Sequence, residues 1–341
     1  MRATLLLFAG VSTAALASDP APAPRPVVRA VIESSLPTAK GNIRQFAFDA
    51  NPDTYFESAR NAAKDDHLTL TFDEPIRPRT VAVALGRPGV DTEGAAYVLE
   101  YSADGTTFRP DRPVVVKAFR VRVTKDLPQP FAVREITINS TPKVVPFRYP
   151  VEFALDVSDA PEMKAWGEKV VRVCEREYPD ICSFLASDGF TPPTQIRMTL
   201  KNDYNGVAAA GGGRIVGSVK YFTSNPNDVG AMVHETVHCV QNYKARGLPG
   251  WLVEGVADYV RFWKYEPGKA GRLQPERAKY DGSYRTTAAF LAFVSEKYDS
   301  RAVPKLNALL RENRYTPEAW RTLTGKSVDE LNQEWRQSLA R

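Results

Sequence analysis

The sequence lacks several features that would assign it to a common class of protein. Its 45 lysines and arginines form no basic run although the net charge is +5, so nucleic acid is not an expected partner. After the first 17 residues, no apolar segment approaches membrane-spanning length. The glycine run at 211–213 is not followed by a helix with a phosphate-binding lysine, which argues against a nucleotide-binding loop. With 43% hydrophobic and 25% charged residues, the composition is that of a globular protein.

Residues 1–17 have the pattern of a secretory signal peptide. Arg2 supplies the positive charge, residues 5–9 and the small residues after them form a short apolar region, and Ala15-Leu16-Ala17 fits the cleavage rule. The alternative, an uncleaved membrane anchor, would need a longer apolar stretch. We therefore expect a secreted or periplasmic protein that starts at Ser18, with no transmembrane segment after signal removal. No cysteine follows the cleavage site, so a lipid anchor is not expected.

The remaining chain is long enough for two domains. Residues 18–28 are rich in proline and alanine and are predicted to be an extended tether. Residues 29–140 contain short alternating segments separated by turn residues, which predicts an all-β sandwich or barrel. Prolines mark a linker at 141–150, and residues 151–341 have helical periodicity with a few strands, which predicts an α+β domain. The predicted strands are 68–72, 80–85, 97–101, 118–123, 196–200 and 214–222, and the predicted helices are 161–177, 225 to about 246, 251–263, 285–298, 303–313, 316–322 and 327–340.

Two of the three histidines are four residues apart, at 234 and 238, with Glu235 beside the first. Residues four apart share one face of a helix, so His234 and His238 can bind one Zn²⁺ while Glu235 acts as the general base. The third histidine, His67, begins a predicted strand and is interpreted as an ordinary sheet residue. Asn225 as a cap and Pro226 at the first turn favour a helix start before the motif.

A catalytic zinc needs a third protein ligand and one open position. Glu254 and Asp258 are again four apart on the next predicted helix, close enough in sequence to return to the histidines. We predict Glu254 as the ligand and Asp258 as the acceptor for the free N–H of one histidine. The opposite assignment, with Asp258 as the ligand, stays open.

These residues predict hydrolysis of a peptide bond by a zinc-activated water. Zinc lowers the pKa of the water to about 7, and Glu235 takes the proton and passes it to the leaving amine. Tyr280 and Tyr284 are candidates for a hydroxyl that stabilises the oxyanion, and Tyr284 is preferred. The strand 214–222 is a candidate edge along which an extended peptide pairs.

The three cysteines offer two interpretations. Cys174 and Cys182 are predicted at a helix end and the following turn, where they either pair in an oxidising compartment or remain two buried thiols. Cys239 points about 100° away from His238 around the helix, so packing is expected for it rather than metal binding.

The segments 230–241 and 249–261 together resemble the plant basic secretory protein family of zinc peptidases, which also has bacterial members. The resemblance covers about 147–341. It implies a zincin-like, gluzincin-like metallopeptidase domain that acts on a peptide or protein substrate. Trp251 and Cys239 depart from the usual residues of the family, but neither departure removes a ligand.

Segments 48–56 and 99–108 resemble the discoidin or coagulation-factor C-type domain, a galactose-binding-like jelly roll. The resemblance implies a possible glycan ligand. It also implies a structural Ca²⁺ held by Asp49 and Asp53, although Ala50 and Phe56 replace the commoner glycine and tryptophan. The alternative interpretation of these acids is a turn whose backbone amides they cap.

The sequence as a whole predicts an exported zinc metallopeptidase with an N-terminal sandwich that binds a glycan or a cell surface. The alternative is a surface-binding or glycan-binding protein whose metal site is vestigial or structural.

Overall fold

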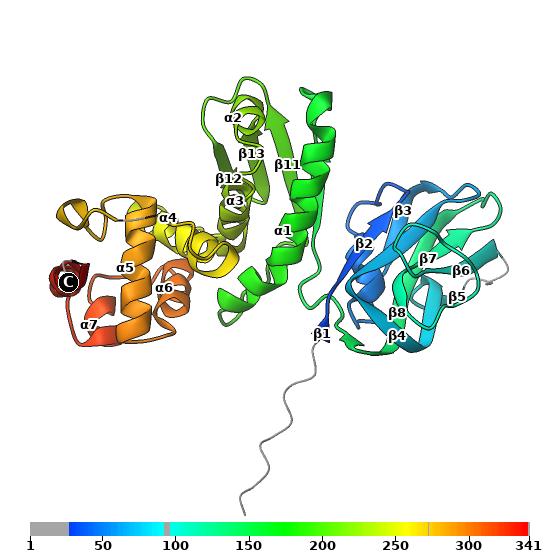
Figure 1. Ribbon diagram of the computed structural model, residues 1–341, viewed down its shortest axis with the longest axis horizontal. Helices are drawn as coiled ribbons and strands as arrows, with labels where there is room; N and C mark the ends of the chain where they lie inside the picture. Colours follow the sequence, from blue (N-terminus) through cyan, green and yellow to red (C-terminus); the bar gives the residue numbers. More distant parts are fainter. Residues whose placement is uncertain (1–26, 92–95, 272, 340–341) are drawn as a thin grey trace, which may run out of the picture.

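The computed structural model describes residues 27–91, 96–271 and 273–339 (Figure 1). The predicted signal segment 1–17 and most of the predicted tether lie outside the described residues. The last two tether residues, Val27 and Val28, instead form strand β1, which pairs in parallel with β9 (Lys143–Val144). Two separate hydrophobic cores follow along the chain, one within residues 28–144 and one within 151–335.

The first core lies inside a β-sandwich, as the alternating segments predict (Figure 1). Strand β4 is long enough to belong to both layers: its first part pairs with β2 and β7, and its part from Arg77 to Leu85 pairs with β8. A short 3-10 helix, η1 (Arg44–Phe48), joins β2 and β3. The strands are β2 (Ala30–Ser34), β3 (Phe56–Asn61), β4 (His67–Arg87), β5 (Val90–Asp91), β6 (Tyr97–Ser102), β7 (Val116–Val123) and β8 (Pro130–Thr141).

Alternation along the strands explains this core. In β4, Leu68, Leu70 and Phe72 are buried while the residues between them are partly exposed, because successive side chains point to opposite faces. Phe72 lies beside Phe119 of β7, with ring centroids 6.3 Å apart. His67 begins β4, as predicted for an ordinary sheet residue.

The second core lies in an α+β arrangement of a four-stranded sheet and helices. The sheet has the order β10-β11-β13-β12, in which only β12 is antiparallel to its neighbour. Helices α1 and α3 pack against each other and against the sheet, where α1 contacts β10 and α3 contacts β12, the strands at the two ends of the order. The strands are β10 (Glu152–Asp156), β11 (Gln195–Lys201), β12 (Ala208–Gly211) and β13 (Arg214–Ser218).

Helices make up the rest of the chain and agree with the predicted segments to within a few residues for α4 to α8. Among the described residues, we find no helix that combines the length and the apolar character needed to cross a membrane. The helices are α1 (Lys164–Phe184), α2 (Val219–Ser224), α3 (Gly230–Gln241), α4 (Gly250–Tyr259) with a π-helical continuation (Val260–Tyr265), α5 (Tyr284–Lys297), α6 (Ala302–Arg311), α7 (Ala319–Thr324) and α8 (Val328–Leu339).

Of the two interpretations of Cys174 and Cys182, the structure agrees with two buried thiols and not with a disulfide. Helix α1 does not end near residue 177 but continues through Pro179 to Phe184, so both cysteines lie on one helix. Their separation of eight residues corresponds to about 12 Å along the axis, whereas a disulfide needs Cα atoms within about 7 Å. Both thiols are free and buried, which agrees with the other interpretation.

Two local predictions around the motif are also corrected. The strand predicted at 214–222 ends at Ser218, whose hydroxyl accepts a hydrogen bond from the Tyr221 amide and so caps α2. Helix α3 begins at Gly230 rather than near Asn225, which instead ends α2. The same helix ends at Gln241, followed by Asn242 in the left-handed conformation with φ 44°, rather than near residue 246 as predicted.

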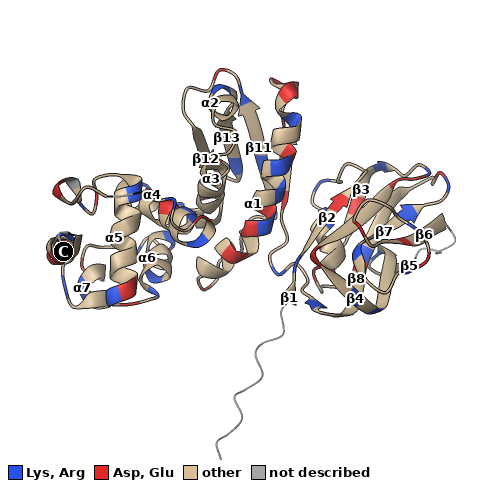
Figure 2. Cartoon of the chain, in the orientation of Figure 1, with Lys and Arg blue, Asp and Glu red and all other residues tan. Residues whose placement is uncertain are grey.

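Charged side chains connect the sandwich to the helical part. The guanidinium of Arg44 lies between Glu152 of β10 and Glu175 of α1. Glu175 also accepts a hydrogen bond from the Phe153 amide at 2.9 Å, so its carboxylate joins η1, β10 and α1. A second pair, Arg29 with Asp180, is exposed at the rim of this interface. Figure 2 shows acidic and basic positions interspersed along α1, the helix that faces the sandwich.

Candidate metal centre

Helix α3 brings the two motif histidines together. Four residues apart, His234 and His238 project from the same face, and their Nε2 atoms are 3.1 Å apart. Both side chains are nearly buried, at 10% and 14% exposure. The rest of the helix is buried in the core, which holds this face in place.

Helix α4 brings Glu254 to the histidines. After Asn242 reverses the chain, α4 returns so that Glu254 Oε2 lies 3.1 Å from His234 Nε2 and 3.3 Å from His238 Nε2. Within the described ranges, these three residues are the one group of three or more His, Cys, Asp or Glu side chains able to hold a metal ion.

Each histidine is hydrogen-bonded on the side away from this cluster. His234 Nδ1 lies 2.7 Å from Asp258 Oδ1, and His238 Nδ1 lies 2.7 Å from Gln241 Oε1. Our sequence reasoning singled out Asp258 but missed Gln241. The available signal was its position three residues after His238, on the same helix face.

The donor atoms fit a cation. Because each Nδ1 is hydrogen-bonded to a side-chain oxygen, each neutral imidazole presents the lone pair of Nε2 to the cluster. Two lone pairs and a carboxylate oxygen at 3.1–3.3 Å repel one another unless positive charge lies among them. Tetrahedral ligands with bonds of about 2.0 Å are separated by about 3.3 Å, which matches these distances.

The pKa values of the cluster report the same demand for positive charge. Burial lowers the pKa of His234, but its hydrogen bonds to Asp258 and Glu254 oppose burial and raise the pKa to about 9. Burial raises the pKa of Glu254, but the two histidines outweigh it and lower the pKa to about 2. Burial also raises the pKa of Glu235, which favours this carboxylate as a proton acceptor.

A glycine lets α5 approach α4 closely. A Cβ on Gly255 would lie 2.1 Å from Thr287 Cγ2, so the close contact of α4 with α5 requires glycine at this position. The approach brings Tyr284, the first residue of α5, beside His234, with ring centroids 6.2 Å apart and ring planes at 19°. The charge of Glu254 raises the pKa of Tyr284, so its hydroxyl keeps its proton.

Tyr280, the other tyrosine that we considered, lies in a different environment. Its ring packs against Trp251 and Phe290, and its backbone carbonyl accepts a hydrogen bond from the Thr287 hydroxyl. The structure therefore places Tyr284 beside the histidines and Tyr280 among the packed aromatic side chains. Cys239 is buried in the core, as expected for packing.

The edge of the sheet beside α3 is β12 and not the predicted strand at 214–222. Strand β13 is paired on both sides, with β11 and with β12, so its backbone is not available to a peptide. Strand β12 is paired with β13 and ends the strand order on that side. Its residues, Ala208 to Gly211, have small side chains or none and are partly or fully exposed.

Asp49 and Asp53, the two residues predicted to bind calcium, lie in different environments. Asp49 accepts hydrogen bonds from the Thr54 hydroxyl at 2.9 Å and the Asn51 amide at 3.0 Å, which is the turn geometry of the alternative interpretation. Asp53 is exposed. The structure instead brings Glu135 of β8 to Asp49. In the part of the chain that the structure describes, Glu135 Oε2 is buried without a hydrogen-bond partner, and burial and Asp49 raise the pKa of Glu135 to about 7. A buried oxygen without a partner fits a hard cation.

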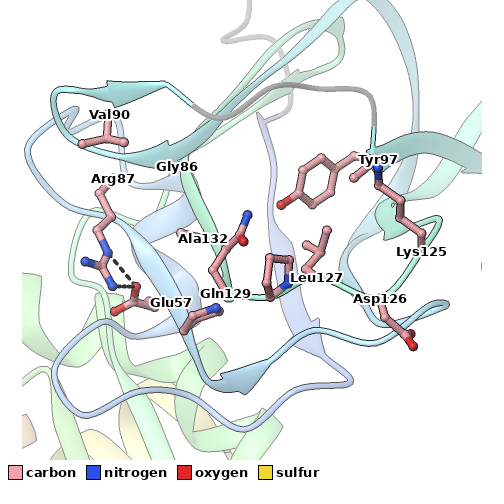
Figure 3. Close-up of a pocket in the computed structure, with 13 residues that line it drawn as sticks. Glu57, Gly86, Arg87, Val90, Tyr97, Lys125, Asp126, Leu127, Gln129 and Ala132 are labelled. Atoms are coloured by element: carbon pink, nitrogen blue, oxygen red, sulfur yellow. Dashed lines mark hydrogen bonds and ion pairs between the residues drawn. The ribbon is translucent and has the colours of Figure 1, made fainter.

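A cavity of about 770 Å³ opens on the sandwich between the loops that follow β4 and β7. Figure 3 shows the hydroxyl of Tyr97 and the amide of Gln129 directed into this cavity. Lys125 lies at one side, and at the other Arg87 Nε donates to Glu57 Oε1 at 2.7 Å. The cavity thus combines an aromatic face with polar groups of both charges.

Comparison with known proteins gives one family match. Residues 161–335 match the family model described as BSP, peptidase of plants and bacteria. No curated protein matches the chain.

Solved structures resemble about a third of the chain. The module CBM32-1 from a family 31 glycoside hydrolase of Clostridium perfringens is 14% identical and covers 32% of this chain and 92% of its own, with a TM-score of 0.28. The family 32 module of C. perfringens NanJ, solved with galactose, is 11% identical with the same coverage and TM-score. Chitosan-binding module 2 from Paenibacillus sp. IK-5, solved with chitotriose, is 17% identical and covers 32% and 94%, with a TM-score of 0.26.

Proposed function

The chain belongs to the BSP family, the peptidases of plants and bacteria, and from this premise we propose that it is a zinc-dependent peptidase. The observation that carries the proposal is the convergence of His234, His238 and Glu254, whose ligand atoms lie within 4.8 Å of one another. The same helix α3 places Glu235 beside them, buried at 8% exposure.

Zinc suits this set of ligands. Two imidazole nitrogens and one carboxylate oxygen are typical protein ligands of catalytic zinc, which keeps one position open. When bound, zinc would lower the pKa of a water to about 7 and polarise a carbonyl group. We assign Glu254 as the third ligand because its oxygen faces both Nε2 atoms, whereas Asp258 faces Nδ1 of His234. This arrangement supports a zincin-like domain of the gluzincin type.

The chain's own residues move the proton and hold the developing charge. Glu235 accepts the proton of the attacking water and delivers it to the amine that leaves. Burial raises the pKa of Glu235, which favours its carboxylate as the acceptor of this proton. Tyr284, half-exposed beside His234, donates a hydrogen bond from its hydroxyl to the oxyanion and keeps its proton. Asp258 keeps the His234 ring in its orientation.

We propose that the substrate is an extended peptide that pairs with β12. Helix α3 packs directly on this strand, so a peptide along its outer edge runs past the histidines. Main-chain hydrogen bonds would supply affinity without demanding a particular side chain opposite Ala209. This predicts broad cleavage of unfolded chains, which mass spectrometry of the products would measure.

The decisive experiment changes Glu235 to Gln. The E235Q variant is expected to keep about one zinc per molecule and to lose the chelator-sensitive cleavage of an unfolded protein. Glu168→Gln, on the exposed face of α1, is the matched control and should cleave as the wild type does. Equal cleavage by E235Q would refute the mechanism. A zinc-loaded wild type that cleaves nothing in a broad peptide library would support the rival, a surface-binding protein with a non-catalytic metal site.

We further propose the domain division and the export of the protein that the sequence indicates. Residues 1–17 would direct export, 29–140 would form the sandwich, 141–150 the linker and 151–341 the catalytic domain. The two separate hydrophobic cores support this division. Sequencing the N-terminus of the exported protein tests it, with Ser18 as the expected first residue.

A second function, glycan binding by the sandwich, is supported by the cavity of Figure 3. Sugars stack on aromatic rings and hydrogen-bond to convergent polar groups, and here Tyr97, Gln129 and Lys125 supply both. On a glycan array, Gln129→Ala is expected to lose the signal that the wild type shows. Lys40→Ala, away from the cavity, serves as the control. No wild-type binding to any glycan would remove this proposal.

We also propose a structural Ca²⁺ held by Asp49 and Glu135 together with the Thr54 hydroxyl. The buried Oε2 of Glu135 supports it, because none of the described residues is a hydrogen-bond partner of this oxygen.

A further inference from the structure

Gln241 connects the two helices that carry the metal ligands. It is the last residue of α3 and is 1% exposed. Its Oε1 lies 2.7 Å from His238 Nδ1, and its Nε2 donates to the carbonyl oxygen of Val253 at 2.9 Å. Val253 precedes Glu254 on α4, so one amide contacts a ligand histidine at one end and the backbone beside the carboxylate ligand at the other.

The chemistry of these partners determines the direction of every hydrogen bond. A backbone carbonyl only accepts, so the NH₂ group of Gln241 must face Val253. Its Oε1 therefore faces His238 and can only accept. His238 Nδ1 must then carry the proton, which leaves Nε2 with a free lone pair directed at His234 and Glu254.

We propose that Gln241 is a positioning residue that holds His238 in the tautomer and orientation needed to bind the metal. The inference rests on the proposed function and concerns the metal site alone. The two histidines have different Nδ1 partners: His234 is held by the carboxylate of Asp258, and His238 by the neutral amide of Gln241. Three acids, at 235, 254 and 258, already surround the site, and an amide adds no further negative charge.

The backbone of Gln241 is itself held firmly. Arg311 donates to the carbonyl oxygens of Val240 at 2.9 Å and Gln241 at 3.2 Å, where the last turn of α3 has no helical partners. The same guanidinium contacts Leu185 O at 2.8 Å and stacks on the ring of Phe190, 3.6 Å from its centroid. Gln241 therefore acts from a fixed position.

The test compares zinc affinity, measured by competition with a chelating dye, among variants of the full chain. Gln241→Leu removes both hydrogen bonds at similar volume and is expected to weaken zinc binding about 10- to 100-fold. Gln241→Glu keeps an acceptor for His238 but loses the donor to Val253, and is expected to bind within a few-fold of the wild type. Val240→Ala is the control, since it removes buried volume one residue away and should lower stability without changing zinc affinity.

A second measurement reads the tautomer directly. In the zinc-loaded wild type, ¹⁵N spectra are expected to show a proton on His238 Nδ1, and Gln241→Glu should retain it.

Unchanged zinc affinity in Gln241→Leu overturns the inference. Equal weakening in Gln241→Glu and Gln241→Leu also overturns it, because the connection to Val253 would then be the whole effect. A wild type that binds zinc but cleaves no peptide contradicts the proposed function and leaves this inference standing. A wild type that binds no zinc overturns both.

Discussion

Replacing Arg44 by methionine is predicted to destabilise the helical part of the protein, although this residue lies in the sandwich. Its guanidinium, 17% exposed, is the counter-charge of Glu152, 13% exposed, and of Glu175, 4% exposed. In addition, Arg44 Nε donates to the Ile32 carbonyl at 2.9 Å. The R44M substitution would leave the Glu175 carboxylate buried, with the Phe153 amide as its remaining neighbour among these contacts.

The burial of Glu175 and Glu152 determines how much free energy of unfolding R44M loses. Removing one partner of a buried ion pair costs about 3–5 kcal/mol, because the other charge stays buried without compensation. The exposed pair of Arg29 and Asp180, at 45% and 58%, crosses the same interface and should contribute about 1 kcal/mol or less. R29M is therefore the matched control, and the two variants should differ in the free energy of unfolding by about 2–4 kcal/mol.

Acid should reduce the cost of R44M. Burial raises the pKa of Glu175 even though Arg44 opposes it, and loss of Arg44 raises this pKa further. The folded state then binds a proton more tightly than the unfolded state, so stability is retained at low pH and lost as pH rises through the raised pKa. The gap between R44M and wild type should accordingly be wider at pH 7 than at pH 5.

Urea unfolding followed by tryptophan fluorescence measures this effect without interference from the sandwich. All five tryptophans, at 166, 251, 263, 320 and 335, lie in the helical part. A lower urea midpoint for R44M than for R29M is the expected result, and R44M/E175L should recover most of the loss because an apolar pair needs no counter-charge. Equal midpoints for R44M and R29M would refute the reasoning.

Three further predictions follow from contacts in the structure. Gly255→Ala places a Cβ 2.1 Å from buried Thr287 and should lower the free energy of unfolding by about 1–3 kcal/mol, measured by urea titration; an unchanged midpoint would contradict the close contact of α4 with α5. Tyr284→Phe should lower kcat about 100-fold with little change in KM, and an unchanged kcat would exclude its hydroxyl from the oxyanion. Ca²⁺ should raise the Tm of the wild type but not of Glu135→Gln, whereas equal shifts in calorimetry would place the ion elsewhere.

The β-strand pattern of the first domain and the placing of two histidines on one helix face could be predicted because they depend on short stretches of sequence. His234 and His238 share a face of any helix that contains them, and the helical repeat needs no information from the rest of the chain. The alternation of buried and exposed residues in β4 likewise identified a sheet. Gly325, left-handed at φ 80°, ends α7 in the gap between the predicted helices 316–322 and 327–340.

Predictions failed where the local signal competes with packing. Pro179 is unfavourable inside a helix, yet α1 continues past it because Ile181 and Cys182 are buried in the core. That continuation separates the two cysteines. The residues after Ser218 were predicted to continue the strand. They form helix α2 instead, which buries Val219 and Phe222, three residues apart, on one side.

By itself, the sequence determined which side chains could meet across one turn of helix, because backbone geometry sets that spacing. Only the tertiary structure decided which groups from other segments complete them. The amide of Gln241 reaches the carbonyl of Val253, and Glu135 reaches Asp49, through folding of the intervening chain. Such contacts depend on the packing of whole elements, which no short stretch of sequence encodes.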